Sequence, residues 1–329
     1  MTSIISSLPV LVLYPHARCN CRCVMCDIWK DTSQAEITAE DLARHLADIE
    51  SLDVKWVVFS GGEPLMHSDL FRLSGMLRSR NIRVTLLSTG LLLNRYAQQI
   101  LTRIDDVIVS LDGPPPIHDQ IRRVPGAFAQ LERGVHAIHD LNPAYRISAR
   151  CTIQRLNYSC PSETVRLAKA LGLCSISFLA ADLTSEAFNR FRPWEAHRQA
   201  QVALTLEEVW TLQRELEGVD RDWGTSGFVA ENAEKLRRIS DHFRVYLGLS
   251  RPQAPRCNAP WVSAVIEGNG TVRPCFFHPP IGSLKSHTLL QVVNGFEAQQ
   301  FRSSLDVATN PVCARCVCSL NWKSSEKLA

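Results

Sequence analysis

The sequence lacks the features that mark membrane, secreted and nucleic-acid-binding proteins. None of its apolar stretches approaches the roughly 18 residues needed to span a bilayer. Residues 1–9 carry no basic segment, as a secretory signal would. Charge of one sign is not in excess either, because 36 Lys and Arg face 33 Asp and Glu, for a net charge of +3. We therefore expect a cytoplasmic protein with neither nucleic acid nor membrane as a partner.

Cysteine is the residue that the chain has in unusual number. There are twelve in 329 residues, and most of them gather near the two ends. A secreted disulfide scaffold would be short and cysteine-dense throughout, whereas clusters in a long chain from a reducing compartment more often bind metal. The remaining composition, 45% hydrophobic and 21% charged, is that of an ordinary globular protein.

The first half of the chain alternates short β-rich runs with helical patterns. Six runs rich in Val, Ile and Leu predict strands at 10–14, 56–60, 84–88, 107–111, 146–153 and 175–179. One helical pattern begins at Thr38, a potential N-cap, and runs through Leu42, Leu46 and Ile49. Others cover 70–78, 95–102, 127–141 and 162–171. Serial β–α units imply a parallel sheet, and six are too few for a closed eightfold barrel. The predicted fold is α/β, an open partial (βα)6 TIM-like barrel.

The second half has a different pattern. Helices and polar loops are expected from 182 to 254, including a helix that starts at the capping box of Thr205 and Glu208. Two β-like runs around the turn 267–270 then predict a hairpin. We expect three parts: a barrel over 1–181, a helical insert over 182–254 and a small α+β domain over 255–329.

The first cysteine cluster directly follows the first predicted strand. Cys19, Cys23 and Cys26 are separated by three and then two residues. Such a loop can fold three thiolates around one [4Fe–4S] cluster, which leaves one iron open. A zinc site would require a fourth ligand, and Cys21 is expected to point the other way along an extended chain. The spacing favours the cluster over zinc.

With this spacing the chain resembles the radical S-adenosylmethionine (SAM) enzymes, whose signature is Cys-x3-Cys-x2-Cys after the first strand of a partial barrel. The resemblance implies that SAM chelates the open iron. One electron from the cluster then cleaves SAM to a 5′-deoxyadenosyl radical, which abstracts a hydrogen atom from the substrate. An external donor such as a flavodoxin or a ferredoxin would supply the electron.

Several strand ends carry residues that suit a cofactor site. Gly61, Gly62 and Glu63 end the second strand and resemble the family motif that binds the amino group of SAM. Ser88, Ser110 and Asp112 end the third and fourth strands, where ligands bind in parallel α/β folds. These three are candidates for SAM binding, with helix caps and turns as the alternative. The arginines of 118–123 are expected on a solvated basic face.

The second cysteine cluster resembles the SPASM and twitch auxiliary domains of radical SAM enzymes. Cys257 and Cys275 flank the predicted hairpin, and Cys313, Cys316 and Cys318 follow. A full SPASM domain has further cysteines and two extra clusters. We therefore predict one auxiliary [4Fe–4S] cluster, with Cys318 as an alternate fourth ligand to Cys316; taken alone, the spacing would suit zinc.

The other polar and cysteine residues carry weaker signals. Cys151, Cys160 and Cys174 are expected to be buried small residues rather than hydrogen-atom donors. Four charged residues follow the sixth strand and are candidates for substrate contacts: Asp182, Arg190, Arg192 and Glu195. The expected place for each of them is a solvated helix surface.

Three functions follow as hypotheses. The first is oxidation or epimerisation of a small molecule, with the auxiliary cluster accepting an electron. The second is modification of a peptide or protein, as a maturase that forms a crosslink or oxidised residue. Because 18 residues precede Cys19, we expect no peptide-recognition domain there, which favours the small molecule. The third is an iron–sulfur or zinc carrier. The motif at 61–64 argues against it, because a carrier needs no cofactor-binding motif.

Overall fold

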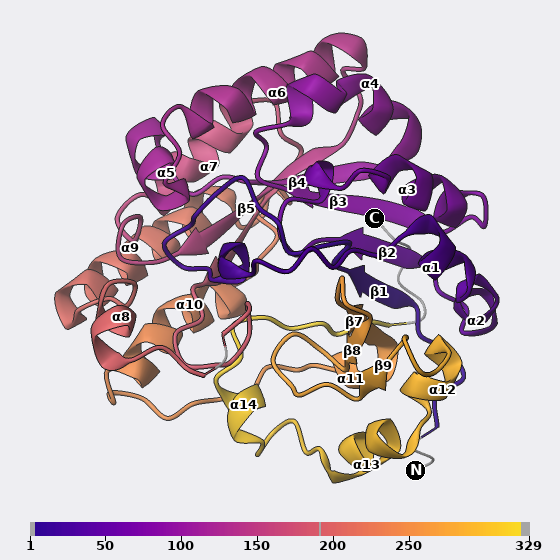
Figure 1. The fold of residues 1–329 in the computed structure, drawn as a ribbon. Helices are drawn as coiled ribbons and strands as arrows, with labels where there is room; N and C mark the ends of the chain where they lie inside the picture. The colour runs from indigo at the N-terminus through magenta and orange to yellow at the C-terminus, as the bar shows by residue number, and fades with distance from the viewer. Residues whose placement is uncertain (1–3, 191, 324–329) are drawn as a thin grey trace. The chain divides into compact units, whose positions relative to one another are not determined.

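The computed structural model describes residues 4–190 and 192–323 (Figure 1). The chain packs into two compact units. The first contains Met1–Arg18, Asp31–Leu86 and Gln253–Ala329, and the second contains Cys19–Lys30 and Leu87–Pro252. The units do not follow the order of the chain, because the N-terminal strand pairs with one from the C-terminal region.

The first unit is built around β1 (Val10–Leu13). It pairs in parallel with β2 (Trp56–Phe59) on one side and with β7 (Ser263–Ile266) on the other. β2 also pairs in parallel with β3 (Arg83–Ser88). β8 (Thr271–Arg273) returns antiparallel to β7, which confirms the predicted hairpin, and β9 (Gly282–Ser283) continues the sheet. The parallel pairing of β7 with β1 was not part of the prediction.

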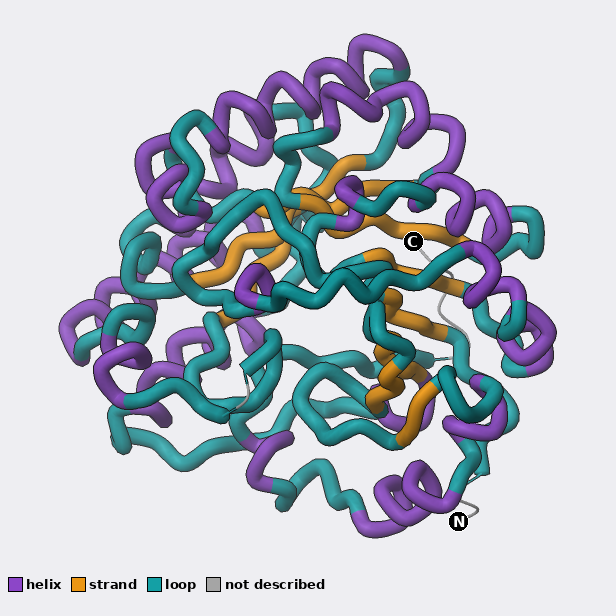
Figure 2. Tube along the Cα trace, in the orientation of Figure 1, coloured by secondary structure: helices purple, strands orange, loops and turns teal. Residues whose placement is uncertain are grey.

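Several helices of the first unit come between its strands along the chain, and Figure 2 draws helices in purple and strands in orange. Thr38 caps α1 through a capping box with Asp41, as its sequence position suggests. One helix was expected to run on from Thr38, but two form, because His45 has a φ of −111° that interrupts the helix. The helices are α1 (Ala39–Ala43), α2 (Leu46–Ser51), η2 (Pro64–Met66), α3 (Leu70–Arg78), α11 (Ala259–Val262), α12 (Leu289–Val293), α13 (Phe296–Ser304) and α14 (Pro311–Ala314).

The second unit contains three parallel strands. β5 (Ile147–Ile153) lies between β4 (Asp106–Ser110) and β6 (Ile176–Ala180). Among the helices, α4 (Leu93–Arg103) packs along α6 (Ala127–Leu141), and α9 (Leu206–Trp223) packs along α10 (Ala233–Tyr246). The helices are η1 (Ile28–Lys30), α4 (Leu93–Arg103), α5 (Pro115–Arg122), α6 (Ala127–Leu141), α7 (Pro161–Ala170), α8 (Ala196–Ala200), α9 (Leu206–Trp223) and α10 (Ala233–Tyr246).

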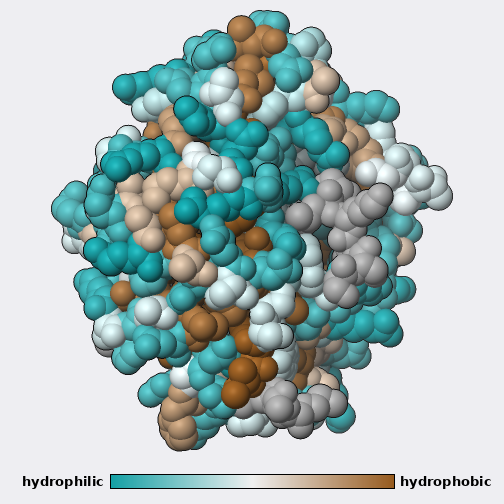
Figure 3. Space-filling view, turned by 90° about the vertical axis from the view of Figure 1, so that its right-hand side faces the viewer, coloured by the Kyte–Doolittle hydropathy of each residue, from teal (hydrophilic) through white to brown (hydrophobic). Residues whose placement is uncertain are grey.

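All six strands predicted for the first half of the chain form, with ends that differ by a residue. Most of their apolar side chains are buried, including Leu11, Val84 and Val109 at no more than 2% exposure. The predicted capping box of Thr205 and Glu208 begins α9. Hydrophilic residues predominate on the face drawn in Figure 3, with smaller hydrophobic groups between them. Within the described residues, no helix is long and apolar enough to cross a bilayer.

Candidate functional site

The cysteine loop is held by the end of α5. The N–H of Arg22 donates to the carbonyl of Arg122 at 3.2 Å, and the N–H of Val24 donates to that of Ile121 at 3.0 Å. These two bonds fix the backbone on both sides of Cys23. A third contact joins the hydroxyl of Thr89, just after β3, to the side-chain oxygen of Asn20 at 3.0 Å. The loop is thus bound to two neighbouring loops of its own unit.

The thiols of this loop occupy different environments. Cys21 and Cys23 are buried, while Cys19 and Cys26 are partly exposed. Cys21 was expected to point away from the other cysteines of the loop. Instead, its thiol hydrogen-bonds to the thiol of Cys23. This bond, followed by the charge of Arg122, lowers the pKa of Cys23 to about 6 despite its burial. Burial raises the pKa of Cys26 to about 12.

Arg122 lies directly beside Cys23. Its Nη1 lies 3.5 Å from the Cys23 sulfur and its Nη2 lies 2.5 Å from Oδ2 of Asp112. The prediction of a solvated basic face is wrong for Arg122, which is 6% exposed, because Asp112 compensates the cost of burying the guanidinium. Arg123, the next residue, is exposed as expected.

The two glycines after β2 are required by close packing. Gly61 has a φ of +96°, a conformation that favours glycine. A Cβ on Gly62 would lie 2.0 Å from the carbonyl oxygen of Arg18. The close approach at Gly62 is therefore to the chain itself, at the residue that precedes Cys19.

Glu63 continues this packing. Its N–H donates to the carbonyl of Arg18 at 2.9 Å, and its fully buried side chain accepts from the N–H of Leu65 at 3.1 Å. The Gly-Gly-Glu turn is thereby attached to the residue from which the cysteine loop starts.

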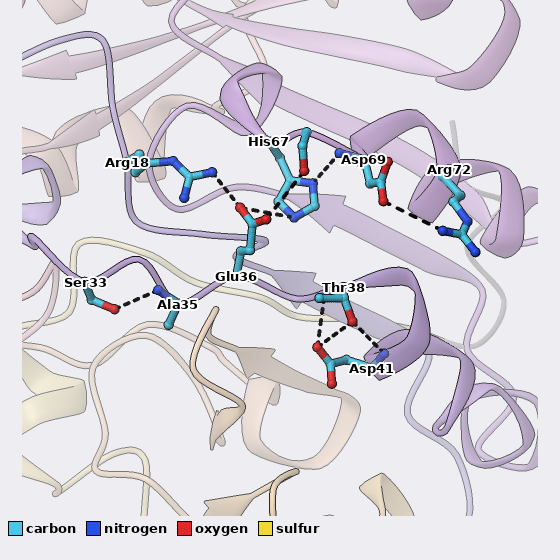
Figure 4. A network of polar contacts seen from close by, with 10 residues as sticks. Arg18, Ser33, Ala35, Glu36, Thr38, Asp41, His67, Asp69 and Arg72 are labelled. Atoms are coloured by element: carbon cyan, nitrogen blue, oxygen red, sulfur yellow. Dashed lines mark hydrogen bonds and ion pairs between the residues drawn. The ribbon is translucent and has the colours of Figure 1, made fainter.

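A charged network surrounds Arg18 (Figure 4). Its guanidinium pairs with Glu36 at 2.6 Å, and Glu36 lies 3.9 Å from Nε2 of His67. The ring of His67 stacks on that of buried His16, with centroids 5.6 Å apart. Asp69 donates its N–H to Nδ1 of His67 at 3.1 Å. The network anchors the backbone just before the cysteine loop.

The other three candidates for SAM binding lie at strand ends, as predicted. Ser88 is buried, and its hydroxyl accepts the N–H of Gly90 at 3.0 Å, which is a turn-forming role. Ser110 is half-buried at the end of β4. Asp112 is fully buried, and besides Arg122 it accepts the N–H of Thr152 at 3.0 Å. A role of these residues toward SAM stays a prediction.

The residues after β6 depart from the expected solvated surface. Asp182 and Arg190 form a buried ion pair, because each compensates the other's charge, whereas Arg192 and Glu195 are exposed as expected. Arg190 also donates to the carbonyl of Met25 at 3.5 Å. Charged residues of this segment are thus bound to the cysteine loop.

Two further residues of the segment bind the same loop. Trp194 donates its Nε1–H to Oδ2 of Asp27 at 2.6 Å, and Arg198 donates to the carbonyl of Val24. Two guanidinium groups contact the Trp194 ring, whose centroid lies 3.7 Å from Cζ of Arg190 and 4.7 Å from Cζ of Arg198. Sequence reasoning missed these contacts, as well as that of Arg122.

The second set of cysteines is brought together in the first unit. The thiols of Cys257 and Cys313 both act on Cys275, whose pKa rises to about 12, mainly through burial. Burial also raises the pKa of Cys316, with smaller contributions from Cys318, Cys275 and Cys257. The four thiols that were predicted as ligands therefore lie within electrostatic range of one another.

Two neighbours complete this set. Nε2 of His278 lies 3.3 Å from the sulfur of Cys313. The thiol of Cys316 donates to the carbonyl of Cys318 at 2.8 Å, and Cys318 itself is exposed. Away from both sets, Cys151 and Cys160 are buried as expected, but Cys174 is exposed because it lies in the loop before β6.

The donors suit iron–sulfur clusters better than single metal ions. Across the described residues, no three His, Cys, Asp or Glu side chains converge closely enough to hold one ion. A [4Fe–4S] cluster is larger, and each thiolate binds a different iron, so its ligands need not converge on one point. All twelve cysteines are described, and none is in a disulfide.

Comparison with known families identifies two iron–sulfur domains in the chain. Residues 13–168 match the model of the Radical SAM superfamily, and residues 257–317 match that of the SPASM iron–sulfur cluster-binding domain. The chain contains a radical SAM domain followed by a SPASM domain. Its radical SAM domain implies a [4Fe–4S] cluster and SAM, and its SPASM domain implies auxiliary iron–sulfur binding.

Characterised relatives of this radical SAM chain include enzymes of heme synthesis. Fe-coproporphyrin III synthase of Methanosarcina barkeri is 30% identical over 62% of this chain and 52% of that protein. AdoMet-dependent heme synthase of the same organism is 26% identical over 65% and 67% of the two chains. The chain thus spans about half the length of the first relative.

Solved structures confirm the fold class. SuiB of Streptococcus suis bound to S-adenosylmethionine superposes with a TM-score of 0.69, covering 97% of this chain and 74% of that one at 16% identity. Native anSMEcpe with bound AdoMet gives a TM-score of 0.66 over 92% and 84% at 18% identity. At such identities the likeness establishes the fold alone: an α/β partial barrel with a C-terminal SPASM-type domain.

Proposed function

We propose that this radical SAM enzyme abstracts a hydrogen atom from a small molecule, in an oxidation or epimerisation. The observation that carries the proposal is the attachment of the Gly-Gly-Glu turn to the start of the cysteine loop. Gly62 packs on the carbonyl of Arg18, and Glu63 donates to the same oxygen at 2.9 Å. A turn that only closed a strand would not need this approach to the residue before Cys19.

The chain's residues have separate roles in this proposal. Cys19, Cys23 and Cys26 would hold the cluster whose open iron takes SAM. Gly61, Gly62 and Glu63 would bind the amino group of SAM, while contacts to its ribose or carboxylate are assigned to Ser88, Ser110 and Asp112. When bound, cluster and SAM together supply one-electron cleavage of SAM and a carbon radical able to remove a hydrogen atom.

The auxiliary set would hold one further [4Fe–4S] cluster. Its proposed ligands are Cys257, Cys275, Cys313 and Cys316, with Cys318 as the alternate to Cys316. With four protein ligands no iron is open to substrate, so the proposed role is to accept the substrate electron. An external donor such as a ferredoxin or a flavodoxin would reduce the first cluster.

A tetrapyrrole is the small-molecule class to test first. Support comes from the relatives, since the two at 30% and 26% identity are named as synthases of Fe-coproporphyrin III and heme. A third relative, at 30% identity over 48% of this chain, is named pre-heme d1 synthase and comes from Dinoroseobacter shibae.

Anaerobic reconstitution tests the cofactor assignment. Wild type is expected to take up about eight irons per chain and to form 5′-deoxyadenosine from SAM and dithionite. The double variant Cys19→Ala with Cys23→Ala should bind about four irons and form no 5′-deoxyadenosine. The double variant Cys257→Ala with Cys275→Ala should also bind about four irons but still cleave SAM. Cys174→Ala, an exposed cysteine outside both sets, is the control expected to match wild type. A fully loaded wild type that leaves SAM intact would refute the proposal.

Substrate class is tested by stimulation of SAM cleavage. A panel of tetrapyrroles that includes Fe-coproporphyrin III should raise 5′-deoxyadenosine formation above the uncoupled rate. Deuterium carried from a labelled substrate into 5′-deoxyadenosine would identify the abstracted hydrogen. Stimulation by peptides and not by tetrapyrroles would instead support a peptide-modifying maturase.

A further inference from the structure

The guanidinium of Arg122 reaches the sulfur of a proposed cluster ligand from inside the second unit. Its Nη1 lies 3.5 Å from the Cys23 sulfur, and its side chain is 8% exposed. Of the three proposed ligands in the loop, Cys23 is the most buried, with 6% exposure. Water therefore contributes little to solvating charge at this sulfur, and the arginine is its main polar neighbour besides Cys21.

The surroundings of Arg122 hold its guanidinium in this position. Nη2 pairs with Asp112 at 2.5 Å, and Asp112 is fixed in turn by the N–H of Thr152 at 3.0 Å. His118 accepts the N–H of Asp112 through Nδ1 at 3.2 Å. The backbone of Arg122 accepts the N–H of Arg22, on the loop itself. Both ends of the residue are thus tied to the structure around Cys23.

We propose that Arg122 is a positioning residue that favours the reduced state of the radical SAM cluster by donating a hydrogen bond to the Cys23 sulfur. The inference rests on the proposed function, because it takes Cys23 as a cluster ligand. Arg122 would thereby raise the reduction potential of the cluster, which the motif cysteines alone do not set.

The physical reason is the charge that reduction adds. A low-potential one-electron reductant, dithionite in the assay, gives one electron to the cluster, and no covalent bond forms or breaks. The added negative charge spreads onto the thiolate sulfurs, where a buried cation and its N–H stabilise it more than they stabilise the oxidised state. Hydrogen bonds to sulfur are among the features that set the potentials of such clusters.

Asp112 has a second role in this arrangement. It compensates the charge of Arg122 while the protein folds and before a cluster is present. Because it binds Nη2, the other nitrogen, Nη1, remains directed at sulfur. The pair therefore offers a polarised N–H to the ligand rather than an isolated buried charge.

The test is a redox titration of the reconstituted enzyme followed by electron paramagnetic resonance. In wild type, the signal of the radical SAM cluster is identified as the one that changes when SAM is added. In each Arg122 variant, it is identified as the one that remains after Cys257→Ala with Cys275→Ala. Arg122→Met should lower the equilibrium constant for reduction about tenfold, which is about 59 mV for a one-electron couple. Arg122→Lys, which keeps the charge, should lower the potential by less than half as much. Arg123→Gln, a change at the exposed neighbour, should leave the potential at the wild-type value.

A second variant guards against misfolding. Arg122→Met leaves Asp112 buried without its partner, so the double variant Arg122→Met with Asp112→Asn removes both charges and should show the same shift. A midpoint equal to that of wild type, in either variant with full iron content, would overturn the inference and leave the proposed function intact. If wild type itself gives no SAM-sensitive signal, the proposed function fails, and the inference falls with it.

Discussion

At the scale of single residues, Gly62 is the position where the least change should have the largest effect. A methyl group there would lie 2.0 Å from the carbonyl oxygen of Arg18 and 2.6 Å from that of Ala17, and backbone atoms cannot rotate away. We expect Gly62→Ala to lower the free energy of unfolding by about 2 kcal/mol and to reduce iron uptake. Denaturant unfolding of the apoprotein and iron analysis of the reconstituted protein measure the two effects.

Gly218 in α9 provides the matched control. Its Cβ would meet no atom closer than 3.5 Å, and alanine is the better helix former by about 0.5–1 kcal/mol. Gly218→Ala should therefore be neutral or stabilising. Equal destabilisation by both changes would show that glycine at 62 has no special steric role.

At the scale of elements, the segment after β6 holds the cysteine loop through side chains. The bond from Trp194 Nε1 to Asp27 at 2.6 Å involves a charged acceptor, a type worth about 1.5–3 kcal/mol when it is buried. Trp194→Phe keeps most of the ring and removes this bond. We expect it to destabilise the protein by about 1–2 kcal/mol and to speed the loss of iron to a chelator.

Trp210 is the control for this change. It lies on α9 with 52% exposure, so Trp210→Phe should alter stability by less than about 0.5 kcal/mol. Iron release is followed by absorbance after addition of a ferrous chelator. Indistinguishable release rates in the two variants would mean that the segment does not secure the loop.

The elements also separate what the sequence could predict from what it could not. Strands such as β4 follow from a local run of apolar residues, and the first cysteine set follows from spacing alone. The contact of Arg122 with Cys23 joins residues 99 positions apart, and that of Trp194 with Asp27 spans 167. A charged side chain reads as solvated in a sequence, because the partner that permits its burial is visible only once the fold brings it near.

The pairing of β7 with β1 was hidden for a related reason. The run at 263–266 is buried throughout, as expected of a strand covered on both faces. Its hairpin with β8 is local and was predicted. Its second partner lies about 250 residues earlier in the chain, and no local pattern specifies a strand so distant.

At the scale of the whole molecule, buried histidines should make stability fall in mild acid. Burial lowers the pKa values of His16, His118 and His242 to about 4 each. Between the unfolded value near 6.5 and these folded values, the unfolded chain binds more protons than the folded one. Stability therefore rises with pH in this window and is lost as pH falls from about 6.5 toward 4.

His118→Asn tests one of these contributions. An asparagine can still accept the N–H of Asp112, which His118 accepts through Nδ1 at 3.2 Å, but it does not titrate. The slope of unfolding free energy against pH between 6.5 and 4 should fall by up to about 1.4 kcal/mol per pH unit, which corresponds to one proton.

Urea unfolding of the apoprotein at a series of pH values gives the slopes for His118→Asn and for wild type. Gly218→Ala, which neither adds nor removes a titrating group, is the control, and its slope should equal that of wild type. If the slope of His118→Asn also stays at the wild-type value, His118 is not buried in its neutral form, and the ties that hold Asp112 against Arg122 are weaker than the geometry indicates.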